Sequence, residues 1–348
     1  MADLLVNGST RRGDHVSARG GYRTVVEDRP FAAFRDGLDE LTSGHDETDR
    51  LVYRLLAEPT SVAKRNVLVL RGGTPVLAAT FRARAGGFEI ATTNCAARLE
   101  PPHRLGHLDA ALAATRLSIV ISETEIVPAA FPSAQVSAHQ WYGADLQDFD
   151  FERHWRSSGV LKELRQTIKR RPELGVQNGD LTSLEWTVAQ WRSRWASHEA
   201  DETGVTDDLL VIWPELLARG RIIVTALVDS DGEPIAGQVS NVDDGFVTAA
   251  ITARDLGVHG VSLGTRVLIE NISSSKREGH TFFDLGGYFD QYKRRFLPAV
   301  GERWTVQYTP RSKVLSRDWS RRKLGGAMRA IGLDPAVLRR HFGGPDGR

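Results

Sequence analysis

Side chains able to do chemistry are concentrated in the stretch from Phe282 to Phe296, FFDLGGYFDQYKRRF. Asp284 could orient an amine or act as a base, and Tyr292 could donate a proton to a leaving group. Lys293 is a compact cation suited to a phosphate or to a developing oxyanion. Each also has a structural alternative: a carboxylate paired with an arginine, a core aromatic residue, and a solvated lysine. We interpret all three residues as catalytic.

A glycine pair interrupts this stretch directly after an apolar strand pattern. Gly286 and Gly287 can adopt backbone conformations barred to other residues, so a ligand can approach the chain closely there. Tyr288 follows at once and could contact the same ligand. A plain turn is the structural alternative for the pair. We expect Gly286, Gly287 and Tyr288 to contribute to substrate binding.

A second candidate element is the start of a helix at residues 257–265. This segment holds three glycines and a serine, which would leave backbone N–H groups and the positive end of the helix dipole open to an anion. An ordinary helix start after a strand would have the same pattern. The residues that we expect to bind a phosphate-bearing group are Arg254, Gly257, Gly260, Ser262, Gly264 and Thr265.

The elements that must position these residues occur twice in the chain. With an offset of roughly 160 residues, Gly73–Ala78 aligns with Gly232–Gly237, and Gly86–Leu99 aligns with Asp244–Leu256. In each half, helical segments precede three strands joined by glycine turns, and a helix and one more strand follow. Coincidental hairpins are the alternative to a duplication. The pattern predicts an α/β protein with two mostly antiparallel, mixed sheets flanked by helices.

The second half has the clearest local signals. Its strands are predicted at RIIVTALV, IAGQVSNV and FVTAAITA, and the helix after them can be capped by Ser262 and closed by Gly279. Trp191 and Trp195 are four residues apart on a preceding helix, and we expect them in the core. A basic helix from Phe151 to Arg171 links the two halves.

We expect five regions along the chain: a flexible leader at 1–21, an N-terminal domain at 22–150, the linking helix at 151–175, a catalytic domain at 176–310 and a basic helical tail at 311–348. The first domain continues after its last predicted strand, LSIVIS, without an equivalent of the Gly-Gly-Tyr and Lys stretch. We therefore expect it to be non-catalytic, or to form one wall of an acceptor cleft.

Composition excludes several classes of protein. The chain of 348 residues has one cysteine, Cys95, so it can form neither an intrachain disulfide nor a thiolate metal cage. A formal net charge of +1 gives no global attraction to nucleic acid or membrane. No segment has the apolar length of a signal peptide or of a membrane span. We expect a cytoplasmic protein that binds no metal and no membrane, and its oligomeric state stays open.

The second half resembles the GNAT superfamily of acyltransferases, and within it the CelD-like branch that is related to the FemAB aminoacyltransferases. The resemblance is carried by the three-strand meander, the helix SLGTRVLIENISSSKREG and the stretch FFDLGGYFDQYKRRF. Relatives show a strand ending in Asp/Glu-x-Gly and then an aromatic-Lys pair, which Asp284, Gly286, Tyr292 and Lys293 match. The resemblance covers Thr182 to Phe296 well, and for the whole chain it implies two tandem GNAT-like domains.

One loop departs from the family pattern. GNAT proteins usually carry Arg/Gln-x-x-Gly-x-Gly/Ala before this helix, where the phosphates of acyl-CoA bind. Arg254 and Gly257 match this pattern, but His259 stands where a small residue is expected, and Gly260 follows one position later. The departure weakens the prediction of an acyl-CoA site more than the prediction of the fold.

The resemblance implies an N-acyltransferase that moves an acyl group such as acetyl from acyl-CoA to an amine of a small molecule, sugar or peptide. The alternative is a FemAB-like enzyme that uses aminoacyl-tRNA to form an amide on a small molecule or peptide, and a second alternative is a non-catalytic assembly protein. The basic linking helix and the tail from Arg311 onward could hold tRNA phosphates or be solvated faces. The acceptor, the donor and the general base stay open.

Overall fold

The computed structural model describes residues 15–19, 21–44, 47–58, 64–83, 89–97, 119–124, 134–195, 203–286 and 291–308. The strands of these segments are β1 (His15–Arg19), β2 (Tyr22–Glu27), β3 (Lys64–Arg71), β4 (Thr74–Ala83), β5 (Glu89–Ala97), β6 (Ile119–Thr124), β7 (Gln135–Asp145), β8 (Gly175–Asn178), β9 (Ile222–Val228), β10 (Pro234–Asp243), β11 (Phe246–Arg254), β12 (Phe282–Asp284) and β13 (Ala299–Tyr308). The helices are α1 (Ala32–Leu41), α2 (Glu47–Ala57), α4 (Phe151–Ser157), α5 (Val160–Arg170), α6 (Leu181–Trp195), α7 (Thr203–Ala218), α8 (Leu263–Arg277) and α9 (Lys293–Phe296).

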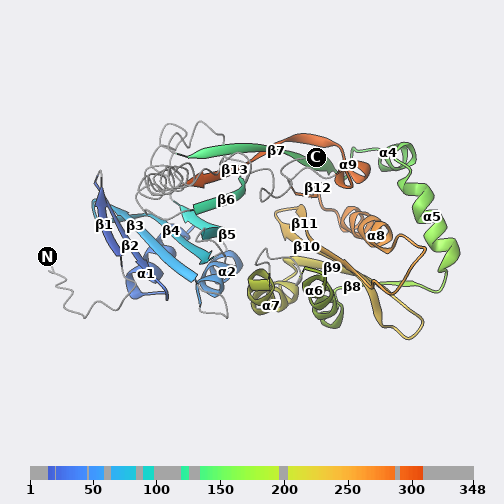
Figure 1. Ribbon diagram of the computed structural model, residues 1–348, viewed down its shortest axis with the longest axis horizontal. Helices are drawn as coiled ribbons and strands as arrows, with labels where there is room; N and C mark the ends of the chain where they lie inside the picture. The colour runs from blue at the N-terminus through green and yellow to red at the C-terminus, as the bar shows by residue number, and fades with distance from the viewer. Residues whose placement is uncertain are drawn as a thin grey trace, which may run out of the picture.

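The described strands form one continuous sheet in the order β1-β2-β3-β4-β5-β6-β13-β7-β12-β11-β10-β9-β8 (Figure 1). The same topology occurs twice in it. Strands β3, β4 and β5 are antiparallel and β6 pairs parallel with β5, just as β9, β10 and β11 are antiparallel and β12 pairs parallel with β11. The predicted α/β class, with mostly antiparallel mixed sheets flanked by helices, is confirmed, and the two predicted sheets are joined into one.

Strands β7 and β13 join the two halves of the sheet. Strand β7 pairs with β12 on one side and with β13 on the other, and β13 also pairs with β6. The chain therefore returns from the second half to complete the first, although β13 lies within the region predicted as the C-terminal domain, 176–310. The proposed domain limits stay predictions, but this pairing means that neither half has a complete sheet of its own.

Two predicted segments differ from the structure. Residues 15–19 of the predicted leader form β1, which pairs antiparallel with β2 at the edge of the sheet. The linking region holds two helices, α4 and α5, because Gly159 between them adopts a left-handed conformation with φ of 80°. The predicted first-half helix RLGHLDAALAATR, residues 1–14 of the leader and the tail at 311–348 lie outside the described residues.

In the second half, helices cover both faces of the sheet (Figure 1). Gly237 of β10 faces α6, where a Cβ at this position would lie 1.8 Å from the hydroxyl of Thr187. Ser240 of the same strand faces α8 on the opposite side, where its hydroxyl donates to Asn271 over 2.8 Å. The strands between α6 and α8 are thus buried on both faces, which explains their apolar sequences.

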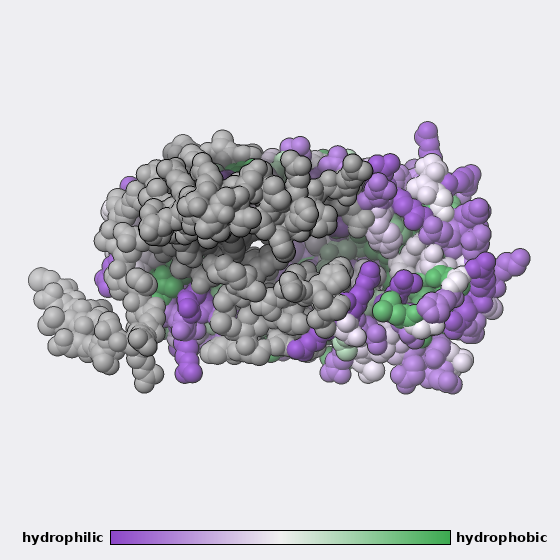
Figure 2. All heavy atoms as spheres, in the orientation of Figure 1, coloured by the Kyte–Doolittle hydropathy of each residue, from purple (hydrophilic) through white to green (hydrophobic). Residues whose placement is uncertain are grey.

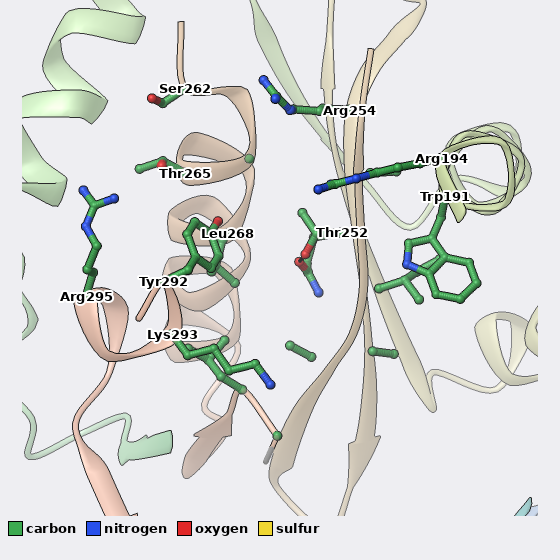
Figure 3. Close-up of a pocket in the computed structure, with 18 of the residues that line it drawn as sticks. Trp191, Arg194, Thr252, Arg254, Ser262, Thr265, Leu268, Tyr292, Lys293 and Arg295 are labelled. Atoms are coloured by element: carbon green, nitrogen blue, oxygen red, sulfur yellow. Dashed lines mark hydrogen bonds between the residues drawn. The ribbon is translucent and has the colours of Figure 1, made fainter. Parts of the chain in front are cut away.

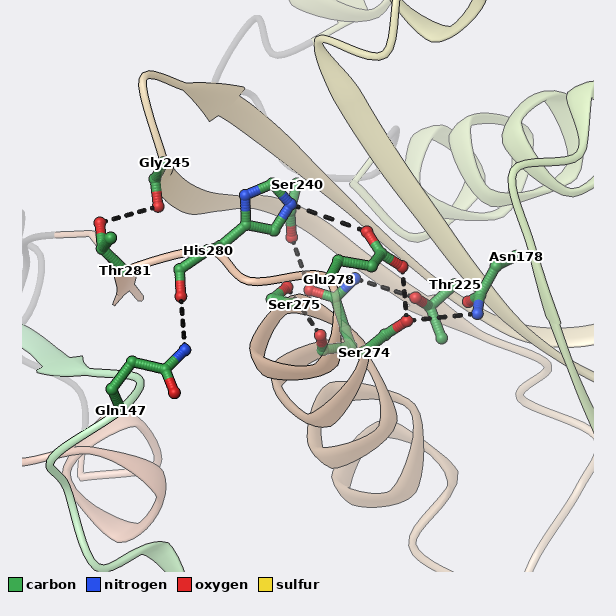
Figure 4. A network of polar contacts seen from close by, with 11 residues as sticks. Gln147, Asn178, Thr225, Ser240, Gly245, Ser274, Ser275, Glu278, His280 and Thr281 are labelled. Atoms are coloured by element: carbon green, nitrogen blue, oxygen red, sulfur yellow. Dashed lines mark hydrogen bonds and ion pairs between the residues drawn. The ribbon is translucent and has the colours of Figure 1, made fainter.

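A buried polar network fixes α8 on the sheet (Figure 4). Asn271 is fully buried, and its side chain accepts from Ser240 of β10 and donates to Thr225 of β9 over 2.9 Å. The Ser275 hydroxyl donates to the Asn271 carbonyl one turn away. Because each of these buried groups has a partner only in this register, the network specifies how α8 sits on β9 and β10.

Among the helices of the described segments, none combines the length and the apolar character needed to cross a bilayer.

Candidate active site

The candidate site lies where β11 and β12 separate. Residues 246–248 of β11 pair with residues 282–284 of β12, and β11 then continues to Arg254 beyond the end of β12. The register of β11 against β10 shifts at Ala250, and such a bulge bends a strand. After Thr248, the backbone N–H and C=O groups on this edge of β11 therefore make no hydrogen bonds to β12.

A cavity of about 830 Å³ occupies this opening. Its walls are β11, the first turns of α8, the last turns of α6 and the residues that follow β12 (Figure 3). Trp191 and Arg194 come from α6, whereas Ser262, Thr265 and Leu268 belong to α8 or its start. Because α6 and α8 cover opposite faces of the sheet, the cavity connects the two faces through the gap between the strands.

The start of α8 forms one end of this cavity. Val261, Ser262, Gly264 and Thr265 line it, and the first turn of an α-helix has N–H groups without intrahelical acceptors. Part of this turn is already engaged, since the Ser262 N–H donates to the Thr167 hydroxyl of α5 over 3.1 Å. The N–H groups of residues 263–265 have no intrahelical acceptors, and with the positive helix end they are a suitable place for an anion.

Glu163 of α5 links this turn to the segment after β12. It accepts a hydrogen bond from the Thr265 hydroxyl over 3.1 Å and forms an ion pair with Arg295. Both members of the pair are one-third exposed. The pair therefore fixes α9, which carries Lys293, against the start of α8.

Tyr292 and Lys293 both line the cavity from α9 and its preceding residue. The Tyr292 ring packs on Phe296, with centroids 4.7 Å apart, and Phe296 is fully buried. A Cβ at Gly264 would lie 3.7 Å from the Tyr292 hydroxyl, so that hydroxyl sits at the first turn of α8. A methyl group at position 264 would make ordinary van der Waals contact with that hydroxyl, so the approach does not itself require glycine.

Asp284 has surroundings that favour a positioning role over the predicted catalytic one. It is 1% exposed, and one carboxylate oxygen accepts from the Trp141 indole over 2.8 Å and from the Gly286 N–H over 2.5 Å. The other oxygen pairs with Arg303 over 2.7 Å. These contacts hold the chain at Gly286, where φ is 75°, as it leaves β12. Asp284 is not among the described residues that line the cavity, and its predicted catalytic role stays a prediction.

The cavity is electropositive. Of the described residues that line it, Arg194, Arg254, Lys293 and Arg295 carry a positive charge, and Glu163 carries a negative one. Figure 3 shows Arg254 extending from the end of β11 toward the start of α8, and Arg194 reaching past β11 from α6. An excess of cations in a cavity favours a ligand with several negative charges.

The α6 wall is positioned by a helix cap at Asp180. The Asp180 carboxylate accepts from the Ser183 N–H over 2.9 Å and from the Ser183 hydroxyl over 3.1 Å. The bond from the Ser183 N–H, followed by that from its hydroxyl, holds the pKa of Asp180 below its usual value. The cap fixes the beginning of the helix whose last turn carries Arg194.

The structure brings most of the predicted site residues together. Those that line the cavity are Arg254, Ser262, Gly264, Thr265, Gly286, Tyr292 and Lys293. Gly257 and Gly260 lie in the loop before α8 and shape it: the Gly257 N–H donates to Asp255 over 2.7 Å, and Gly260 has φ of 76°. Gly287 and Tyr288 lie outside the described residues. The roles of all these residues stay predictions.

The cavity residues that sequence reasoning missed include Glu163, Trp191, Arg194 and Gln238. Trp191 was expected in the core, and it does pack partly against the cluster of Leu184 and Val188, but it also lines the cavity. No local pattern marks these residues, because they come from three elements that meet only in the folded chain.

Residues 152–294 match a family model described as an acetyltransferase (GNAT) domain. No curated protein matches the chain in sequence. Similar solved structures include the C-terminal DUF2156 domain of a putative lysylphosphatidylglycerol synthetase from Agrobacterium fabrum, at 12% identity and a TM-score of 0.52, covering 82% of this chain and 94% of that one.

L-PGS from Bacillus licheniformis is also 12% identical, with a TM-score of 0.52, and the match covers 81% of this chain and 93% of that one. A tandem GNAT protein from the clavulanic acid biosynthesis pathway is 15% identical, with a TM-score of 0.49 and coverage of 82% and 97%. At such identities the first two likenesses concern the fold alone. The match to the GNAT model covers residues 152–294, which is less than half of the chain.

Proposed function

We propose that the protein is an N-acyltransferase that moves an acyl group such as acetyl from acyl-CoA to an amine of a small molecule, sugar or peptide. The observation that carries this proposal is the cavity between the diverging strands β11 and β12, which has walls from both faces of the sheet. Such an opening lets a donor and an acceptor enter from opposite sides and meet at the strand edge.

The donor phosphates fit the start of α8. The turn supplies backbone N–H groups, and Arg254 extends toward it from β11 (Figure 3). Glu163 lies on the α5 side of this turn and would repel a phosphate there. A donor would therefore lie on the β11 side, where the cations are in excess.

The acyl carbonyl would then lie beside the unpaired edge of β11. In the reaction, the acceptor nitrogen forms a bond to the carbonyl carbon, the carbonyl oxygen becomes an oxyanion, and the carbon–sulfur bond breaks. Lys293 and the backbone N–H groups of the β11 edge are suited to stabilise the oxyanion, and the Tyr292 hydroxyl is suited to protonate the leaving thiolate. The amine loses its proton to solvent or to a base that remains to be identified.

A ligand-binding experiment tests this proposal first. Acetyl-CoA and CoA should raise the midpoint of thermal unfolding, with about 2.7 kcal/mol of stabilisation at a ligand concentration a hundredfold above Kd. Lys293→Ala should lower the rate of acyl transfer far more than it lowers stability. Arg294→Ala is the matched control, because Arg294 is the exposed next residue and does not line the cavity. Equal activity of the two variants would remove Lys293 from the mechanism.

One observation favours aminoacyl-tRNA as an alternative donor. Beside the cavity, a groove of about 280 Å³ on α4 and α5 is lined by Arg156, Lys162, Arg165 and Lys169, together with Leu161 and Gln166. Figure 2 shows hydrophilic residues over this end of the molecule. Four cations in one groove can bind successive phosphates of an RNA backbone. The affinity for tRNA would then fall steeply as the salt concentration rises.

The two donors are distinguished by the same titrations. If charged tRNA stabilises the protein and CoA does not, the donor is aminoacyl-tRNA, and alanine at Lys162 and Arg165 should reduce the salt dependence. If CoA alone acts, these variants should leave the stabilisation by CoA unchanged. If neither donor binds, both enzymatic functions are excluded and a non-catalytic role is left. We place the reaction in the cytoplasm, where either donor is available.

A further inference from the structure

We infer that the acceptor is an amine that carries an aromatic ring, and that this ring binds to an aromatic row beside the cavity. The aromatic row consists of Trp141 on β7, Phe282 on β12 and Phe246 on β11. The inference rests on the proposed acyl transfer and adds the chemical class of the acceptor to it. It is drawn from the contacts within the row, from its place next to the cavity and from its apolar character.

The rings of the aromatic row contact one another across three neighbouring strands. The ring centroids of Trp141 and Phe282 are 5.6 Å apart, and those of Phe282 and Phe246 are 5.3 Å apart. Both distances are typical of favourable aromatic pairs. Gly143 of β7 leaves the space for the middle ring, since a Cβ at this position would lie 2.6 Å from the Phe282 ring. The row is therefore one continuous apolar surface on β7, β12 and β11.

The aromatic row lies on the face of the sheet opposite to α8. Val247 and Phe283, the next residues along β11 and β12, are buried in the cluster that includes the apolar side chains of α8. Because side chains alternate along a strand, Phe246 and Phe282 point to the other face. Trp141 shares that face, since its ring contacts Phe282. The proposed donor site is at the start of α8, so the row lies on the face from which the acceptor would enter.

The aromatic row is continuous with the cavity. Phe246 and Phe282 are register partners at the beginning of the paired part of β11 and β12, and the two strands separate after residues 248 and 284. Thr248, which lines the cavity, follows Phe246 by two residues on the same face, a distance of about 7 Å along the strand. An acceptor whose ring lies on the row can therefore place its amine at the opening between the strands through a short linker.

Part of the aromatic row is exposed. Phe246 is 48% exposed, and Phe282 and Trp141 are half-buried. Helix α6 packs on this face over β9, β10 and β11, and the row continues beyond it toward β7. A large apolar surface at the edge of a cavity is typical of a ligand-binding site. A ring that covers Phe246 would remove apolar area of both partners from water.

An aromatic ring suits the row better than a sugar. The polar groups beside the row already have a partner: the Trp141 indole N–H donates to Asp284 over 2.8 Å, and Arg303, whose guanidinium lies over the indole, pairs with the same carboxylate. A bound sugar would lose water from its hydroxyl groups and would need new hydrogen-bond partners for them. The row offers the faces and edges of rings, which favour a planar apolar group.

The test compares two amines with a ring, phenethylamine and tryptamine, with propylamine and with glucosamine. Binding is measured by titration calorimetry with and without saturating CoA, and acyl transfer is measured by release of thiol from acetyl-CoA. Burial of one aromatic ring predicts that at least one of the first two amines binds about 10- to 100-fold more tightly than propylamine. Phe246→Ala should remove most of this preference and leave transfer to propylamine unchanged, whereas Phe246→Tyr should retain it.

Val211→Ala is the control and should keep the full preference, because Val211 is an exposed apolar residue of α7 that does not line the cavity. The inference is overturned if neither ring-bearing amine binds more tightly than propylamine, if glucosamine binds most tightly, or if the preference survives in Phe246→Ala. A change of oligomeric state in Phe246→Ala without a change of preference would also overturn it, since the row would then be an interface between copies of the chain. Failure of CoA to bind would refute the acyl-CoA proposal, whereas titrations without CoA would still decide the preference for a ring.

Discussion

Replacing Arg303 by methionine should destabilise the protein by about 3 to 5 kcal/mol, the cost of leaving a buried charge without its partner. Arg303 lies on β13 and reaches across β7 to Asp284 on β12, with 2.7 Å between the guanidinium and the carboxylate. Its side chain is 11% exposed and that of Asp284 is 2% exposed. The guanidinium also lies over the Trp141 ring, 4.6 Å from its centroid. The substitution leaves the carboxylate with two neutral donors, the indole N–H and the Gly286 N–H.

Urea unfolding followed by tryptophan fluorescence measures this loss. Arg219→Met provides the control, because Arg219 also approaches its partner Glu215 to 2.7 Å, but with side chains that are 34% and 45% exposed. An exposed pair of this kind contributes about 0 to 1 kcal/mol. The two substitutions make the same chemical change in ion pairs with the same N···O distance, and the pairs differ in how far their side chains are buried. Equal losses in the two variants would refute the argument that burial makes the Asp284 pair important.

A second substitution separates positioning from catalysis at Asp284. Asparagine at this position can still accept from Trp141 and Gly286, so Asp284→Asn combined with Arg303→Met should recover part of the stability lost in Arg303→Met alone. If Asp284 is a positioning residue, transfer activity should follow the folded fraction in these variants. If Asp284 is instead the catalytic base, the Asp284→Asn protein should lose activity while it is still fully folded.

Three further predictions concern stability. Gly237→Ala should cost about 1 to 3 kcal/mol because the new methyl group meets Thr187, and a Thr187→Ala background should reduce that cost. Asn271→Ala should cost about 2 to 3 kcal/mol in urea unfolding, because it leaves buried hydroxyl groups on two strands without a partner. Asp180→Ala should cost about 1 kcal/mol near neutral pH. Because the folded-state pKa of Asp180 is lowered, its contribution is present above the unfolded pKa of about 4 and is lost as the pH falls through the folded value, so wild type and variant should converge in acid.

Local patterns were sufficient for the second meander and its helix. The predicted strands IAGQVSNV and FVTAAITA correspond to β10 and β11, and the turn between them has positive φ at Asp244 and Gly245, as a two-residue hairpin turn requires. The predicted helix after Ser262 is α8. The patterns that predict these elements are local: alternating apolar and polar residues, turn residues and helical periodicity each extend over a few residues of the chain.

Such local patterns could not predict which strands distant in the sequence pair with each other. Strands β7 and β13 have polar, half-exposed sequences that give little periodic signal, and their pairing joins residues more than a hundred positions apart. The partner of Asp284 depends on that pairing, so the sequence could suggest an ion-paired carboxylate but could not identify Arg303. Arg194 was missed for a related reason, because its approach to the cavity depends on the gap between β11 and β12.

The position of β13 has a consequence for synthesis of the protein on the ribosome. Until residues 299–308 have left the exit tunnel, β6 and β7 each present an edge that lacks its final neighbour. The strands β3 to β6 and β8 to β12 would by then have been translated. The nascent chain should therefore be prone to aggregation until Tyr308 has left the tunnel, and a chain truncated before β13 should expose both edges and aggregate.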